Sequence, residues 1–269
     1  MLGRLRSPRS EAGAPRAQPG LTRRLAAGFD RPVQLHGILF DYGGTLDGPG
    51  SHWLDRMVEL YREAGVELPF ERIKDAFYRA DEAAYGDPAV ADMSLAELMD
   101  FHVGAQLGGL GVEDPALRRQ VATAFVRRSE RALARSRAVL TRLAGSHRLG
   151  VVSNFYGNVH RILADAGIAP LLTTVADSQR VGWRKPDPRI FAHALNALGT
   201  EPSATLHVGD SYARDVRAAK AVGLRTAWVA WPDARALAPE PAADLTIVSL
   251  EELLPRLGLA AVESPTGPR

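Results

Sequence analysis

The chain has 269 residues, of which 46% are hydrophobic and 24% are charged, as in an ordinary globular domain. The absence of Cys excludes disulfides, thiolate metal sites and a Cys nucleophile, and no apolar stretch approaches the roughly 20 residues needed to cross a bilayer. The net charge of +2 is uneven: residues 1–34 hold seven Arg against two acidic residues, so residues 35–269 carry a net charge of −3.

The basic N-terminal segment, residues 1–34, is rich in Pro, Gly, Ala and Arg and shows no apolar periodicity. We expect it to be disordered, and we expect a flexible tail at residues 263–269. It also lacks the apolar core of a secretory signal. Because the basic charge belongs to this extension, the folded body is not expected to bind nucleic acid or a membrane. Without Cys or a targeting segment, a cytoplasmic location is expected.

The first predicted strand is the apolar run Leu35–Phe40, which ends at Asp41. Glycines then predict a loop over residues 43–52. From residue 53 to residue 135 apolar residues recur at helical spacing. Start signals for helices lie at Pro69, at the capping box formed by Ser94 and Glu97, and at the pair Asp114-Pro115. We therefore predict an all-helical insert of about four helices over residues 53–135.

Strands and helices alternate through the remainder of the body. Strands are predicted at 149–152, 173–176, 205–208, 225–230 and 245–248, and helices at 139–144, 158–166, 188–198, 213–222 and 249–257. This alternation is typical of βαβ units. The predicted fold class is α/β, a Rossmann-like mainly parallel sheet flanked by helices. Its core would comprise residues 35–52 and 136–262.

Polar residues follow several of these strands. They are Asp41, the pair Ser153-Asn154, Lys185, and Asp210 with Asp215 five residues later. If the strands are parallel neighbours, these side chains meet at one edge of the sheet, where ligands bind in open α/β folds. Several carboxylates with few positive partners suit Mg²⁺. Such a cation, a Lys, a Ser and a glycine-rich loop favour phosphoryl transfer, which depends on positioning and charge neutralisation.

Four motifs in this order resemble the haloacid dehalogenase-like (HAD) hydrolases. They are Asp41-Tyr42-Gly43-Gly44-Thr45-Leu46, Val151-Val152-Ser153-Asn154, Lys185-Pro186, and Gly209-Asp210 followed by Asp215. The helical insert resembles the C1-type cap of this family, which closes over the substrate.

The resemblance implies roles for individual residues. Asp41 would be the nucleophile that forms an aspartyl-phosphate. Asp41, the carbonyl of Gly43, Asp210 and Asp215 would hold Mg²⁺, with Asp215 alternatively keeping Lys185 in place. The phosphate-binding residues would be Ser153, Asn154, Lys185, Gly44 and Thr45. The expected partner is a small phosphorylated metabolite, and the chain is expected to be a monomer or a homodimer.

Gly43 departs from the family pattern, because phosphatases of the family carry there an Asp that protonates the leaving group. Losing general acid–base catalysis typically costs about 10²–10⁴-fold in rate. Three alternatives stay open: a leaving group that needs no proton, such as an acyl or aryl phosphate; cleavage of a C–P or C–halogen bond; or binding without turnover. Asp47 and His52 are expected to serve the turn or its contacts with the cap, with replacement of the missing acid as the alternative. Lys74 is expected on the polar face of its helix, with the Schiff base of C–P cleavage as the alternative.

Overall fold

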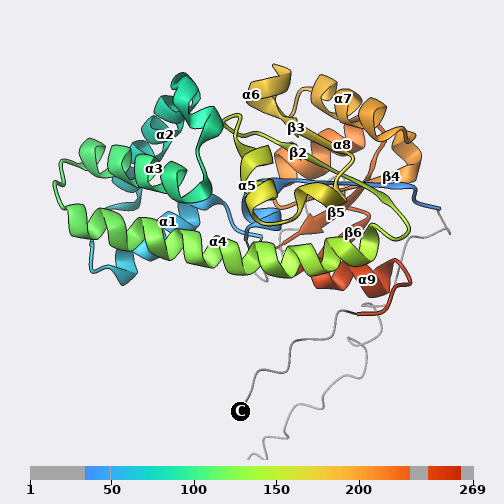
Figure 1. Ribbon diagram of the computed structural model, residues 1–269, viewed down its shortest axis with the longest axis horizontal. Coiled ribbons are helices and arrows are strands. Elements are labelled where there is room, and N and C mark those ends of the chain that lie inside the picture. The colour runs from blue at the N-terminus through green and yellow to red at the C-terminus, as the bar shows by residue number, and fades with distance from the viewer. Residues whose placement is uncertain (1–33, 49, 231–241, 262–269) are drawn as a thin grey trace, which may run out of the picture.

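The structure is a computed structural model that describes residues 34–48, 50–230 and 242–261 (Figure 1). The predicted disorder of residues 1–34 and the predicted flexible tail at 263–269 lie outside these ranges, apart from Gln34. No helix in the described ranges is both long enough and apolar enough to cross a bilayer.

Six parallel strands form one sheet in the order β3-β2-β1-β4-β5-β6. Their bounds are β1 Gly37–Phe40, β2 Arg148–Ser153, β3 Thr174–Asp177, β4 Thr205–Gly209, β5 Arg225–Val229 and β6 Leu245–Ile247. The chain leaves β1 toward β2 and β3 on one side and later continues through β4 on the other. The carboxyl end of β1 is therefore a topological switch point, where α/β sheets open a crevice for ligands. The predicted α/β class is confirmed.

Residues of the central strands alternate between two hydrophobic clusters. Phe40, Val151 and Val208 belong to the larger one, whereas Leu39 and Val152 belong to the other, with Phe191. Helices flank the sheet: α5 Val159–Asp165, α6 Ser178–Val181, α7 Pro188–Leu198, α8 Ala218–Ala221 and α9 Leu253–Arg256. Both faces of the sheet are thus buried, as parallel strands require.

The insert consists of α1 Trp53–Glu63, α2 Phe70–Gly86, α3 Leu95–Leu110 and α4 Pro115–Leu143. Ser94 and Glu97 form the predicted capping box at the start of α3. The predicted border at 135/136 falls inside α4, which joins the two predicted helical stretches into one. Residues 116–143 contain neither Gly nor Pro to end the helix, and Leu133, Val139 and Leu140 keep one face buried.

Local differences from the predicted elements occur beside the sheet edge. Residues 42–46 form a wide helical turn in which Gly43 and Gly44 depart from helical dihedrals, where an irregular loop was predicted. The predicted helix 213–222 divides into a wide turn at Tyr212–Arg217 and α8. No predicted element covers α6 or the short turns Pro88–Asp92, Ala169–Leu171 and Pro202–Ala204. The predicted helix 249–257 divides into a short turn at Leu250–Glu252 and α9.

Candidate active site

Asp41 stands directly after β1, and its backbone N–H donates to the carbonyl of Val208 on β4 at 2.8 Å. The turn that follows depends on Gly44, whose φ is +83°. A Cβ on Gly44 would lie 2.4 Å from Asp210 Oδ2, so only glycine lets the turn pass this close to that carboxylate. The first and fourth motifs therefore touch at the carboxyl edge of the sheet.

Lys185 connects two carboxylates of the site. Its Nζ lies 2.7 Å from Asp41 Oδ1 and 2.5 Å from Asp215 Oδ1, and its side chain is 2% exposed. Burial disfavours the ammonium, but Asp215 and Asp41 outweigh this effect and raise the pKa of Lys185. Ser153 Oγ also donates to Asp41 Oδ1, at 2.9 Å. Lys185 is therefore a fixed cation beside Asp41.

Asn154 positions the backbone of Lys185. Its Nδ2 donates to the carbonyl of Lys185 at 2.9 Å, and its Oδ1 accepts from the Lys185 N–H at 2.7 Å. The side-chain amide thus binds both backbone groups of one residue, as a neighbouring strand would. Asn154 also lines the cavity described below.

Asp215 is surrounded by donors. Its Oδ1 contacts Lys185 and His207 Nε2 (3.1 Å), and its Oδ2 accepts the N–H of Ser211 at 2.9 Å. Burial acts against the charged form, yet Lys185 and His207 lower the pKa of Asp215. Because both oxygens already have partners, the geometry favours a role in holding Lys185.

The carboxylates of Asp41, Asp210 and Asp215 each offer an oxygen within 4.8 Å of the others. Burial, and then the charges of Asp41 and Asp215, raise the pKa of Asp210 well above its ordinary value. Burial also raises the pKa of Asp41, although Lys185 opposes this. Within the described residues, the Asp210 carboxylate accepts one long hydrogen bond, from Thr45 Oγ1 at 3.5 Å. Three acids face Lys185, with the Arg214 guanidinium opposing them more weakly, and this excess of carboxylates fits a hard divalent cation.

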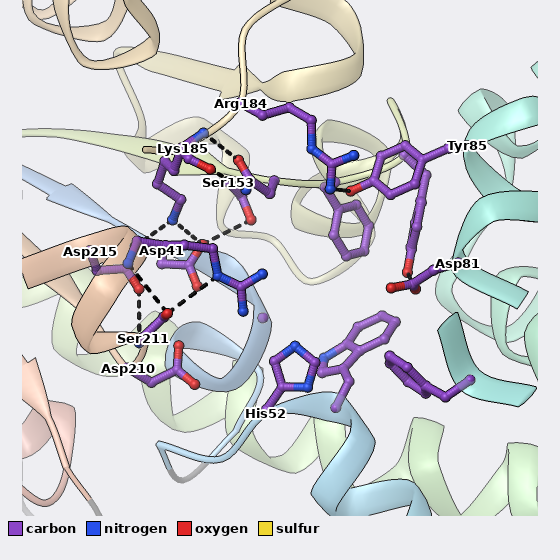
Figure 2. A pocket seen from close by; sticks show the side chains of 17 residues that line it. Asp41, His52, Asp81, Tyr85, Ser153, Arg184, Lys185, Asp210, Ser211 and Asp215 are labelled. Carbon is purple, nitrogen blue, oxygen red and sulfur yellow. Dashed lines mark hydrogen bonds and ion pairs between the residues drawn. The ribbon is translucent and has the colours of Figure 1, made fainter. Parts of the chain in front are cut away.

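A cleft of about 610 Å³, which includes space open to solvent, separates these groups from α1 and α2. Figure 2 shows Asp41, Ser153, Lys185 and Asp210 on one side and His52, Asp81 and Tyr85 on the other. Aromatic walls come from Trp53, Phe77, Tyr85, Phe155 and Tyr156.

Gly43 also lines the cleft, whereas Gly44 and Thr45, predicted to bind phosphate, are absent from its lining. The N–H of Gly44 donates instead to Asp47 Oδ1 at 2.7 Å.

Asp47 is buried away from the cleft, and the idea that it supplies the missing proton is not supported. Besides Gly44, it accepts hydrogen bonds from Trp53 Nε1 (2.8 Å), Arg56 (3.0 Å) and Ser129 Oγ (3.3 Å). It thereby ties the turn after β1 to α1 and α4. A signal was present in the sequence, because Arg56 stands at helical spacing among the apolar residues of α1.

His52 does line the cleft, as the residue before α1. Its Nδ1 accepts the N–H of Leu54 at 3.2 Å, which places the proton of the neutral ring on Nε2. Burial lowers the pKa of His52. Lys74, in contrast, pairs with Glu71 on the exposed side of α2 at 2.5 Å and is not among the cleft residues.

Two arginines that line the cleft were not among the predicted site residues. Arg184 stacks over the Tyr85 ring at 4.2 Å and donates to its hydroxyl at 3.1 Å. Arg214 Nε donates to Ser211 Oγ at 3.2 Å. Their positions gave a signal, since Arg184 directly precedes Lys185 and Arg214 lies between Asp210 and Asp215.

The family model described as haloacid dehalogenase-like hydrolase matches residues 35–223 of the chain. In a segment of 86 residues the chain is 44% identical to bovine (Bos taurus) haloacid dehalogenase-like hydrolase domain-containing protein 3, covering 32% of this chain and 34% of that protein. It is 41% identical over 91 residues to a phosphoserine phosphatase from Thermus thermophilus, covering 34% of this chain and 36% of that one. The chain thus spans about a third of the length of these relatives.

Solved structures share the fold. A HAD phosphatase from Thermococcus onnurineus aligns with a TM-score of 0.51 at 22% identity, over 85% of this chain and 100% of its own. A putative HAD-hydrolase from Bacillus subtilis, bound to magnesium, aligns with a TM-score of 0.53 at 20% identity, over 84% of this chain and 100% of its own.

Proposed function

Because the chain belongs to the haloacid dehalogenase-like hydrolases, we propose that it hydrolyses a small phosphorylated substrate through an aspartyl-phosphate on Asp41. The observation that carries this proposal is the ion pair between Asp41 and the buried Lys185, opposite Asp210. Two relatives named phosphatases, a phosphoserine phosphatase and a pyrophosphatase, support the phosphoryl chemistry.

The hydrogen bonds of Asp41 indicate which oxygen attacks. Ser153 and Lys185 both donate to Oδ1, and Oδ2 accepts no hydrogen bond within the described residues. In the proposed reaction Oδ2 forms a bond to phosphorus while the leaving oxygen departs with the bonding electrons. Water then attacks phosphorus, which releases phosphate and restores the Asp41 carboxylate. Lys185 and Ser153 would bind the transferring oxygens, and Asp215 would keep Lys185 in place.

The residues that would hold Mg²⁺ are Asp41, Asp210 and the carbonyl of Gly43. When bound, the cation would offset the repulsion between these carboxylates and the phosphate. The fit rests on the excess of negative charge in the site and on the raised pKa of Asp210.

Of the other reactions considered, C–P cleavage loses its support, because Lys74 is not among the cleft residues. The acid-rich cluster favours a cation and a phosphoryl group over C–halogen cleavage. A cytoplasmic location and a monomeric or homodimeric state stay predictions from the sequence.

The test is phosphate release from a panel of phosphomonoesters and acyl phosphates with Mg²⁺, using wild-type protein and Asp41→Asn. We expect release by the wild type and a loss of at least about 10³-fold in the variant. Thermal unfolding of both proteins would show that the variant is folded. Equal release by the two proteins would exclude Asp41 as nucleophile, and no release from any member by wild type would favour binding without turnover.

A further inference from the structure

Asp81 on α2 faces the cleft from the side opposite Asp41, Lys185 and Asp210 (Figure 2). Its side chain is 22% exposed. The catalytic proposal gives it no role. A carboxylate on this side of the cleft would contact the leaving-group portion of a substrate whose phosphate lies at Asp41.

A buried chain of hydrogen bonds fixes Asp81 from behind. Tyr61 OH donates to Gln106 Oε1 at 3.3 Å, and Gln106 Nε2 donates to His102 Nδ1 at 2.7 Å. His102 Nε2 must then carry the ring proton, and it donates to Asp81 Oδ1 at 3.1 Å. His102 and Gln106 are fully buried between helices, where apolar side chains would pack at lower cost. This chain of hydrogen bonds therefore serves to orient the Asp81 carboxylate.

Tyr156 provides a second donor to the same oxygen, since its hydroxyl hydrogen-bonds to Asp81 Oδ1. Burial, and then the charge of Asp81, raise the pKa of Tyr156 well above its ordinary value, so the hydroxyl keeps its proton. Both donors meet Oδ1. Within the described residues Oδ2 accepts no hydrogen bond, and it is left for a ligand in the cleft.

The surroundings of Asp81 suit a cation. In the described part of the chain neither Lys nor Arg pairs with Asp81, and its partner His102 carries a single ring proton, because Nδ1 accepts from Gln106. Among these residues the carboxylate therefore lacks a cationic partner. Two arginines line the cleft: Arg184 is engaged with Tyr85, and Arg214 donates to Ser211 on the side of Asp210. The rings of Phe77, Tyr85 and Tyr156 line the same side of the cleft, and aromatic rings attract ammonium groups.

We propose that Asp81 binds an ammonium group on the substrate, which makes the substrate class an aminoalkyl phosphate. The proposal rests on the proposed phosphatase function for the placement of the phosphate at Asp41. An aminoalkyl substrate is also consistent with the absence of an acid at position 43, because an ammonium substituent makes the departing alkoxide less basic and reduces its need for a general acid.

Binding can be tested without turnover. Calorimetric titration with Mg²⁺ would compare aminoalkylphosphonates with alkylphosphonates and hydroxyalkylphosphonates of the same length, in a series of increasing chain length. We expect the best aminoalkylphosphonate to bind about tenfold more tightly than either neutral partner, as a charge-assisted hydrogen bond provides. Equal binding of the aminoalkyl and hydroxyalkyl compounds would overturn the proposal.

Asp81→Asn keeps the shape of the side chain and removes its charge, so it should abolish the preference for the ammonium. The matched control is Asp75→Asn, an exposed acid on the same helix, which should keep the preference. A preference that survives Asp81→Asn would also overturn the proposal. If that variant does not fold, the wild-type comparison of charged and neutral phosphonates still decides.

Phosphate release separates this inference from the proposed function. With aminoalkyl phosphates as substrates, Asp81→Asn should raise KM about tenfold and change kcat little, because it acts on binding. An ammonium preference in binding without release of phosphate would contradict the proposed hydrolysis and support the ammonium site. Release of phosphate without an ammonium preference in binding would support the proposed hydrolysis and contradict the ammonium site.

Discussion

A side-chain carbon added to Gly43 would lie 3.6 Å from the indole nitrogen of Trp53, in ordinary van der Waals contact. Gly43 has φ −70° and ψ 118°, dihedrals that any residue adopts. Position 43 also lines the cleft. Nothing in the backbone therefore requires glycine here, and the missing acid is a chemical difference that a single substitution can reverse.

Gly43→Asp should accordingly raise kcat for alkyl phosphates by about tenfold or more, because it supplies a general acid at the leaving oxygen. The increase should be much smaller for aryl and acyl phosphates, whose leaving groups need no proton. Steady-state kinetics on the three classes measures this, with Gly43→Asn as the control for shape. An unchanged rate for alkyl phosphates would refute our explanation of the missing acid.

Gly44, one residue later, should behave in the opposite way. Its positive φ and the 2.4 Å approach of a Cβ to Asp210 Oδ2 mean that Gly44→Ala strains the turn and displaces Asp210. We expect a loss of about 1–3 kcal/mol in the free energy of unfolding, measured by denaturant titration. Gly43→Ala is the matched control and should change stability little. Similar stabilities for the two alanine variants would contradict the close approach.

Lys185→Met should destabilise the protein by about 3–5 kcal/mol, because it leaves the buried carboxylates of Asp41 and Asp215 without their cation. Lys220→Met removes an ion pair with Asp244 that is partly exposed and should cost about 0–1 kcal/mol. Denaturant titration compares them. Adding Asp215→Asn to Lys185→Met should recover part of the loss, and a further loss in the double variant would argue against the charge explanation.

Stability of the metal-free protein should depend on pH through Asp210. An acid whose pKa is raised on folding binds more protons in the folded state, so the free energy of unfolding falls as pH rises from about 4 through the raised pKa. Asp41 acts in the same direction. Asp215 acts oppositely, since its lowered pKa gives stability that is lost as pH falls toward the acid range.

Mg²⁺ should offset the loss of stability at neutral pH, because a cation that binds the folded state raises its melting temperature. Calorimetric melting across pH, with and without Mg²⁺, measures this. Asp210→Asn should raise the melting temperature of the metal-free protein, flatten its pH dependence and remove most of the Mg²⁺ response. An equal response to Mg²⁺ in both proteins would place the cation elsewhere.

The sequence predicted the sheet and the meeting of Asp41, Ser153 and Asp210 because each directly follows an apolar run, whereas Lys185 lies in a loop after another strand and was placed by its motif. Strand adjacency then determines where they meet. It did not predict the contact of Asp81 with His102, 21 residues away on another helix. Such contacts depend on how α2 packs against α3, which periodicity alone does not define. The expectation that Asp47 serves the turn and its contacts with the insert holds, but its particular partners, Trp53, Arg56 and Ser129, could not be read from periodicity.

Helix α4 is one uninterrupted element of 29 residues, about 43 Å long, that packs against α3 at one end and contacts α9 beside the sheet at the other (Figure 1). The two contacts are therefore joined by a single helix. A tilt of the helices above the cleft, as a ligand enters or leaves, would be transmitted through α4 to the C-terminal helix α9. A fluorescent label near α9 would then report occupancy of the cleft from the far end of the molecule.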